Sequence, residues 1–235
     1  MRLLVRDRAH EALLARFYDE LYLPAFAHQR EPLDAWREQL WGASPAPYDL
    51  AITLALDATP AAGDLADTRI PCRIDGGIVG ELYPASRCAI LTYMVVAPHA
   101  RGAGLGRALL DDARRELVAR GARAVFAEVS DPAQTPPAHA TEAHERLARF
   151  QRWGARVVDH PYVQPDLGYG RDRALRLIAF EPAGAVSLDG DALRAFLHEF
   201  YAVTERLDPT SGPARDHELA PLLAAIPDQV PLRRM

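Results

Sequence analysis

The chain has 235 residues, of which 49% are hydrophobic and 25% charged, and its formal net charge is −5. Acidic residues outnumber basic ones and there is no basic tail, so the composition is that of an ordinary globular protein and argues against nucleic acid as a partner. No segment approaches the roughly 20 apolar residues of a membrane span, and charges interrupt the apolar run at the N-terminus, so we expect a cytoplasmic protein without a signal peptide or membrane contact.

Apolar residues recur at helical spacing in two segments before the first expected strand. Glycine, proline and small polar residues then separate shorter runs typical of strands. The elements expected up to residue 77 are, in order, a helix over 10–23, a helix over 31–41, a turn at 44–47, a strand at 49–57, a loop at 58–71 and a strand pair around a turn at Gly76–Gly77.

Strands and helices alternate in the rest of the chain. The elements expected there are, in order, strands at 77–84 and 88–98, a helix over 104–120, a strand at 122–130, a helix over 141–152, strands at 155–164 and 174–181, and a helix over 189–205. This order predicts an α/β fold, a mixed sheet with helices on both faces. We expect residues 1–181 to form the main domain, and 182–235 a helical appendage packed on it or at the interface of a homodimer.

Directly after the nearly continuous apolar run at 88–98, three glycines stand at alternate positions, Gly102, Gly104 and Gly106, between Arg101 and Arg107. The first amide hydrogens of a helix have no internal partners and carry a partial positive charge, so a strand-to-helix turn can bind phosphate oxygens. Glycine lets the phosphates approach the main chain, and the arginines can add charge-assisted hydrogen bonds. The segment therefore predicts a phosphate site.

Spacing separates three phosphate-binding patterns. A P-loop requires Gly-Lys-Ser/Thr, whereas Gly106 is followed by Arg107 and Ala108, and a dinucleotide fingerprint beginning at Gly102 would require glycine where Arg107 stands. The pattern that fits is V-x-P-x-x-R-G-x-G-x-G, from Val96 to Gly106. With it, the chain resembles the GNAT superfamily of acyl-CoA-dependent N-acyltransferases, and the surrounding order of elements agrees from about residue 8 to 181.

The resemblance implies a GNAT-like fold with acetyl-CoA as co-substrate and no metal. In this family two neighbouring strands part, here 88–97 and 122–130, and the pantetheine arm lies between them. Main-chain groups of Met94, Val95 and Val96 would bond the arm, and a donor aimed at the thioester oxygen would stabilise an oxyanion. The residues expected to bind the diphosphate are Arg101, Gly102, Ala103, Gly104, Leu105, Gly106 and Arg107.

Two residues that the family often carries are absent. Many members have a tyrosine four residues before a glycine, which protonates the departing thiolate, and an asparagine seven residues earlier. Here Phe150 stands four residues before Gly154, and Ala143 stands at the asparagine position. The acid is therefore relocated, supplied by water or unnecessary, since a thiol with a pKa of about 8.5 leaves readily near neutral pH.

Attack by an amine requires a base that removes its proton. Glu81, in the strand before the central one, is the first candidate, with a solvent-facing charge as the alternative. Glu128, inside an apolar run, is the second, with capping of the neighbouring backbone as the alternative. Tyr93 lies mid-strand beside the expected thioester, where it positions substrate or donates a proton unless it is a core residue.

The amine acceptor is expected to contact the first two helices and the loop after residue 160, which flank the acetyl end in this family. Tyr162, Gln164 and Tyr169 are suited to hold a polar amine, although Tyr162 also fits a packing role. The predicted function is acetyl transfer from acetyl-CoA to a primary amine of a small molecule or peptide. A non-catalytic acyl-CoA-binding module and a transferase of longer acyl groups stay open as alternatives. The acidic net charge favours cationic acceptors.

Overall fold

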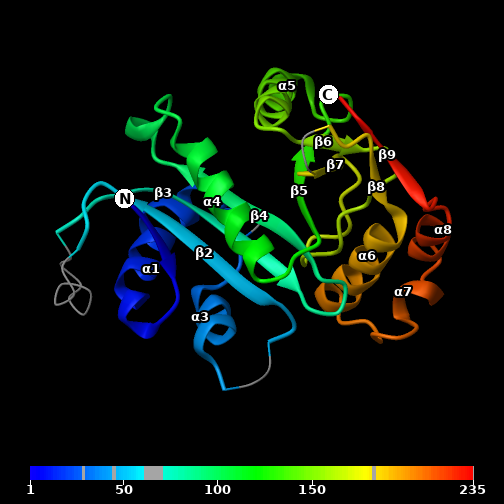
Figure 1. The fold of residues 1–235 in the computed structure, drawn as a ribbon, viewed down its shortest axis with the longest axis horizontal. Coiled ribbons are helices and arrows are strands. Elements are labelled where there is room, and N and C mark those ends of the chain that lie inside the picture. The colour runs from blue at the N-terminus through cyan, green and yellow to red at the C-terminus, as the bar shows by residue number, and fades with distance from the viewer. Residues whose placement is uncertain (28–29, 44–45, 61–70, 182–183, 235) are drawn as a thin grey trace. The chain divides into compact units, whose positions relative to one another are not determined.

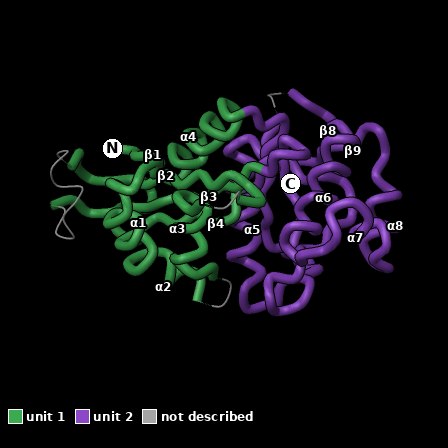
Figure 2. Tube along the Cα trace, turned by 90° about the horizontal axis from the view of Figure 1, so that it is seen from below, with its two compact units in different colours: residues 1–82, 91–120 green, residues 83–90, 121–235 purple. Residues whose placement is uncertain are grey.

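The computed structural model describes residues 1–27, 30–43, 46–60, 71–181 and 184–234. The expected turn at 44–47 and loop at 58–71 therefore lie partly outside the described residues. Contacts divide the chain into two compact units, residues 1–82 with 91–120 and residues 83–90 with 121–235 (Figure 2). The predicted boundary between residues 181 and 182 stays a prediction. In the described part of the chain, no helix is both long and apolar enough to cross a membrane.

The first unit contains most of the predicted helices and strands of the N-terminal half (Figure 1). Its strands follow the order β1-β2-β3-β4. The last residue of β3 and the first three of β4 are counted with the second unit. The elements are β1 (Arg2–Val5), α1 (Glu11–Phe17), a π-helical turn (Tyr18–Tyr22), α2 (Leu23–Ala25), α3 (Leu33–Trp41), β2 (Asp49–Leu56), β3 (Ile74–Tyr83), β4 (Cys88–Val96) and α4 (Leu105–Ala119).

Helices cover both faces of the sheet in this unit. β1, β2 and β3 pair antiparallel, and every residue of β2 except Asp49 is buried. A Cβ atom on Gly77 would meet the ring of Phe17 in α1, whereas one on Gly76 would meet the side chain of Leu109 in α4. Successive residues of a strand point to opposite faces, so α1 and α4 lie on opposite faces of the sheet.

The glycine pair at 76–77 is not a turn, and the strand pair expected there is wrong. β3 runs unbroken through both glycines. Packing requires them, because a Cβ on Gly77 would lie 2.5 Å from a ring carbon of Phe17 and one on Gly76 would lie 2.7 Å from a main-chain oxygen of β4. The register also shifts opposite them, between Ala55 and Leu56, which is the irregularity that glycine in a strand often marks.

We predict that Gly77→Ala lowers the free energy of unfolding by about 1–3 kcal/mol, as overpacking of a filled core does. The reason is the fully buried ring of Phe17, which must move to admit the new methyl group. Chemical denaturation measures the change. In a double-mutant cycle, Phe17→Leu should recover part of the loss, whereas strictly additive effects would show that the ring is not the obstacle.

The second unit carries the C-terminal half, with strand order β5-β7-β6-β9-β8. Neighbouring strands in this order pair antiparallel. The rings of Phe196 and Phe200 in α6 pack on Tyr83 and Phe126. The elements are β5 (Ala124–Ser130), α5 (Pro137–Arg152), β6 (Arg156–Val158), β7 (Leu175–Ala179), β8 (Ser187–Asp189), α6 (Gly190–Thr204), α7 (Gly212–Arg215), α8 (Leu219–Ala224) and β9 (Gln229–Arg233).

The α/β class, with strands β1 to β4 in the first unit, β5 to β9 in the second, and flanking helices, is confirmed among the described residues. Several elements differ from expectation. α5 begins at Pro137, four residues early, because proline is well tolerated in the first turn of a helix. β6 ends at Val158, and the segment after it leaves the sheet. The C-terminal segment contributes β8 and β9 to the sheet as well as the helices α6, α7 and α8, and β1 was not expected at all.

Candidate functional site

The turn between β4 and α4 has the left-handed glycines that its spacing suggests. Gly102 has a φ of +83° and Gly104, the N-cap of α4, a φ of +79°. A Cβ atom on either would meet nothing within 4 Å. The left-handed backbone conformation, and not internal packing, therefore favours glycine here.

The N-terminus of α4 is open at this turn. Residues 101–104 are exposed, and Gly104 has no side chain that could cap the first amide hydrogens. These amides carry the positive end of the helix dipole, and phosphate oxygens are their natural partners. An open helix start is what the predicted diphosphate site at residues 101–107 requires, and binding of an anion there stays a prediction.

Both arginines of the turn already make contacts. The Nε of Arg101 donates to the carbonyl oxygen of Val96 at 3.2 Å, so the side chain folds back onto the end of β4. The Nε of Arg107 lies 2.7 Å from a carboxylate oxygen of Asp111, one turn along α4. Asp111 offsets the charge of Arg107. An anion at this turn would therefore depend more on the main-chain amides than on the charge of the arginines.

Asp75 ties this turn to β3, and sequence reasoning missed it. The Nε2 of His99 lies 2.8 Å from Oδ1 of Asp75, and the amide of Ala97 donates to the Asp75 carbonyl oxygen at 2.9 Å. A hydrogen bond from Arg73, with a further one from His99, holds the pKa of Asp75 below its ordinary value. The pairing joins residues 24 positions apart, so a local sequence pattern does not predict it.

Two of the predicted catalytic residues, Glu81 and Tyr93, lie near each other in the first unit. Glu81 is only 4% exposed. Burial raises the pKa of Tyr93 well above its ordinary value, and the negative charges of Glu31 and Glu81 raise it further. The pKa of Tyr48 is raised in the same way, by burial and then by the charge of Glu81. The charge of one candidate, Glu81, therefore acts on the other, Tyr93.

Glu31 completes this part of the first unit and was not predicted. Its carboxylate accepts a hydrogen bond from Nε1 of Trp36 at 2.6 Å, and its main chain bonds the hydroxyls of Tyr18 and Tyr22. Burial raises the pKa of Glu31, and it raises the pKa of Tyr22 to about 12. The ring of Tyr22 lies edge-on to that of Tyr93 at 4.9 Å, so this cluster holds Tyr93 in place.

Glu128 meets two predicted acceptor residues in the second unit. The hydroxyl of Tyr162 donates to its Oε1, and Nε2 of Gln164 donates to its Oε2 at 2.7 Å. Burial raises the pKa of Glu128, and the two hydrogen bonds oppose that shift. Tyr162 and Gln164 lie 34 and 36 residues from Glu128, so the residue types were predictable but their meeting was not. We call these three residues the Glu128 cluster.

Tyr169 does not join the Glu128 cluster. Its side chain is 73% exposed, in a loop whose start is turned by Asp166. The Oδ1 of Asp166 accepts hydrogen bonds from the amides of Gly168 and Gly170 at 2.7 and 2.8 Å. A substrate contact for Tyr169 therefore stays a prediction.

A model of the acetyltransferase (GNAT) family matches residues 16–143, just over half of the chain. The chain belongs to the GNAT acetyltransferase family. The match contains the glycine turn, Glu81, Tyr93 and Glu128, whereas Tyr162 and Gln164 lie beyond its end. Among curated proteins, no sequence matches this chain significantly.

Solved structures show the same GNAT fold. One from Bacteroides thetaiotaomicron, described as a GNAT-family acetyltransferase, has a TM-score of 0.59 at 17% identity and covers 88% of this chain and 99% of its own. An aminoglycoside 6′-N-acetyltransferase complexed with coenzyme A has a TM-score of 0.51 at 14% identity, covering 78% of this chain and 99% of its own. The GNAT-like fold expected from the sequence is confirmed.

Phe150 stands where many members of the GNAT family have a tyrosine. Its ring packs edge-on against Trp153 at 5.6 Å and Phe180 at 6.2 Å. An apolar ring in an aromatic cluster cannot give a proton to a leaving group. Any general acid in this GNAT protein must therefore come from another residue or from solvent.

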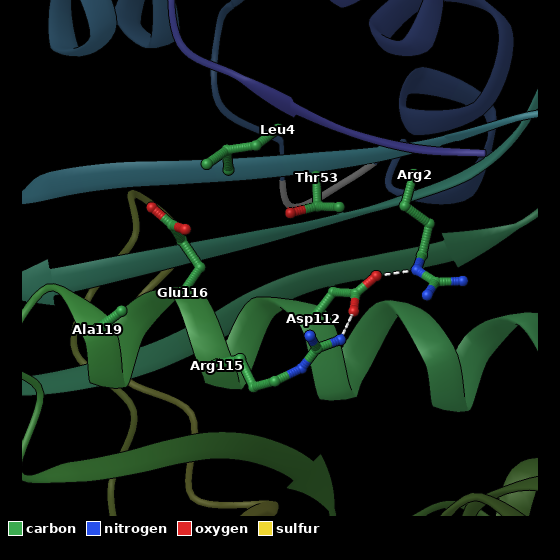
Figure 3. Close-up of a pocket in the computed structure, with 7 residues that line it drawn as sticks. All are labelled: Arg2, Leu4, Thr53, Asp112, Arg115, Glu116 and Ala119. Carbon is green, nitrogen blue, oxygen red and sulfur yellow. Dashed lines mark hydrogen bonds and ion pairs between the residues drawn. The ribbon is translucent and has the colours of Figure 1, made fainter. Parts of the chain in front are cut away.

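A surface cavity of about 360 Å³ in the first unit contains none of the residues predicted for the GNAT reaction. Figure 3 shows it between α4 and the strands β1 and β2, with Asp112 held by both Arg2 and Arg115. Glu116, which also lines the cavity, pairs with Arg6 and Arg120. Its lining residues are Arg2, Leu4, Thr53, Asp112, Arg115, Glu116 and Ala119.

Proposed function

We propose that this protein transfers the acetyl group of acetyl-CoA to a primary amine. The observation that carries the proposal is the glycine turn of a GNAT domain, where left-handed Gly102 and Gly104 leave the start of α4 open to a ligand. A diphosphate there would accept hydrogen bonds from the main chain and interact favourably with the helix dipole. Arg101 and Arg107 would add charge at its rim.

The end of β4 would hold the pantetheine arm through main-chain groups of Met94, Val95 and Val96. The carbonyl of Val96 already accepts a hydrogen bond from Arg101. An arm amide that bonds this carbonyl would displace the arginine side chain, which could then swing toward the diphosphate. Binding of the arm and of the diphosphate would thus be linked through Arg101.

In the proposed reaction, the amine nitrogen attacks the thioester carbonyl carbon, the C–S bond breaks, and coenzyme A leaves as a thiolate. The proton of the attacking nitrogen passes to a carboxylate, directly or through water. Glu128 suits this role, because burial raises its pKa and the Glu128 cluster fixes both of its oxygens. Glu81 is the alternative base, a buried carboxylate whose charge acts on Tyr93.

The missing phenol at Phe150 does not prevent this chemistry. A thiolate whose conjugate acid has a pKa near 8.5 is a good leaving group at neutral pH and can be protonated by solvent. Removing a proton from the acceptor amine is harder than protonating the thiolate, because an ammonium with a pKa near 10 must lose its proton before it can attack. A base is therefore the group on which the rate depends most.

Release of coenzyme A thiol from acetyl-CoA, followed across a panel of small amines, polyamines and peptides, tests the proposal. The chain contains no lysine, so self-acetylation of side-chain amines cannot contribute background. We expect release that depends on one class of amine, with a mass gain of one acetyl group on that amine.

Two other outcomes would change the assignment. Saturable binding of coenzyme A with no turnover on any amine would favour a non-catalytic acyl-CoA-binding module. Faster turnover with a longer acyl-CoA than with acetyl-CoA would favour a transferase of longer acyl groups.

A further inference from the structure

Arg171 uses all of its hydrogen-bond donors on three carboxylates of the C-terminal segment. Its five N–H groups, the full set of a guanidinium, make two bonds to Glu205 at 2.6 and 2.8 Å, two to Asp216 at 2.8 and 2.9 Å, and one to Glu218 at 3.1 Å. The side chain is only 13% exposed. We call Arg171, Glu205, Asp216 and Glu218 the Arg171 cluster.

The Arg171 cluster closes the loop over 166–171 at both ends. One oxygen of Glu205 accepts the Nε of Arg171 and also the amide of Asp166, at 3.0 Å. One helical turn earlier, the hydroxyl of Tyr201 donates to the carbonyl oxygen of Val163 at 2.6 Å. The C-terminal end of α6 therefore holds the main chain on both sides of Gln164.

This restraint reaches the Glu128 cluster through main-chain hydrogen bonds. Asp172, next to Arg171, forms an isolated β-bridge with Gln164, whose amide donates to the Asp172 carbonyl oxygen at 2.7 Å. The Gln164 side chain then donates to Glu128. Between the guanidinium of Arg171 and the carboxylate of Glu128 there is thus a continuous series of bonds.

We infer that Arg171 is a positioning residue for the acceptor side of the reaction: anchored by the C-terminal segment, it fixes the loop that holds Gln164 and Tyr162 on Glu128. This inference rests on the proposed function, in which Glu128 receives the amine proton. The C-terminal segment is then part of the catalytic apparatus, because it supplies every carboxylate of the Arg171 cluster. Lysine cannot replace Arg171, because one ammonium has three donors where five are used.

Arg171→Met and the milder Glu205→Gln test the inference, with Arg173→Met as the matched control. Arg173 also pairs with Glu218 and donates to the carbonyl oxygen of Arg171 at 3.2 Å, but its side chain is 58% exposed and it bonds neither Glu205 nor Asp216. We expect amide hydrogen exchange over residues 163–172 to accelerate at least tenfold in Arg171→Met and to a smaller extent in Glu205→Gln, and to stay within twofold of the parent in the control.

The kinetic readout separates positioning from general damage. We expect Arg171→Met to lower kcat/KM for the amine at least tenfold, with the KM for acetyl-CoA within twofold of the parent, and Arg171→Lys to recover little. Should Arg171→Met fail to fold, Glu205→Gln carries the same comparison. Exchange that is unchanged in both variants, or equal losses for amine and acetyl-CoA, would overturn the inference. If exchange is faster in the two variants but the parent acetylates no amine, the proposed function is refuted and the structural restraint by Arg171 still stands.

Discussion

Glu128→Gln is expected to lower kcat/KM for the amine by about 10²–10⁴, the contribution typical of a general base. The KM for acetyl-CoA should change little, because the substitution leaves the glycine turn intact. Glutamine keeps one accepting oxygen and sets an NH₂ group against the donor of Tyr162 or Gln164, so the free energy of unfolding is measured beside kcat/KM. The folded-state pKa of Glu128 is raised by burial, so its ionised carboxylate costs stability at neutral pH, and that cost disappears as the pH falls through the raised pKa. Glutamine removes this cost at every pH.

The pH dependence of kcat/KM gives a second readout of the same residue. Because the base must be ionised, activity of the parent should fall as the pH drops through the raised pKa of Glu128, above the ordinary value of 4.5. Glu81→Gln is the matched control, since it makes the same chemical change in the other unit. If Glu81→Gln abolished turnover while Glu128→Gln kept it, the base would be Glu81.

Gly104→Asp is expected to weaken coenzyme A binding at least tenfold relative to Gly104→Asn. Both side chains tolerate the left-handed backbone of this N-cap and can cap the helix, and they differ only in charge. A carboxylate about 5 Å from a diphosphate repels each unit of its charge by about 1–3 kcal/mol at the dielectric constants of water and of a protein surface. Calorimetric titration measures both dissociation constants.

Salt and thermal stability supply the controls for this comparison. The gap between the Asp and Asn variants should narrow as ionic strength rises, because salt screens exposed charges. The melting temperature of the Asp variant should equal or exceed that of the Asn variant, because a negative charge is favourable at a helix N-terminus. Equal affinities of the two variants for coenzyme A at low salt would place the diphosphate elsewhere.

Local patterns were enough to predict the glycine turn and most elements of the fold. The turn joins a buried strand to a helix with glycines at fixed spacing, and each of these signals lies within about 20 consecutive residues. Gly76 and Gly77 show the limit of such reasoning. A glycine pair fits a tight turn as well as a crowded strand, and only the distant ring of Phe17 decides between them.

The sequence was enough to predict which residue types form the candidate site, but not which of these residues form hydrogen bonds with one another. Glu128 stood out as a carboxylate in an apolar strand, but its bonds to Tyr162 and Gln164 depend on how the segment after β6 leaves the sheet. Glu31 and Arg171 lie in segments with no strong pattern of their own. Their partners come from other elements, up to 47 residues away for Arg171, so their importance emerges only in three dimensions.

Amide chemical shifts test most directly whether the N-terminus of α4 binds a diphosphate. In protein labelled with ¹⁵N at glycine only, titration with coenzyme A should move the resonances of Gly102, Gly104 and Gly106 and leave glycines outside the turn, such as Gly42 at the end of α3, in place. Pantetheine, which lacks the diphosphate, should leave the three resonances nearly unmoved. If they stay still with coenzyme A, or shift as far with pantetheine, the anion is not held at this turn and the proposed acetyl transfer loses its support.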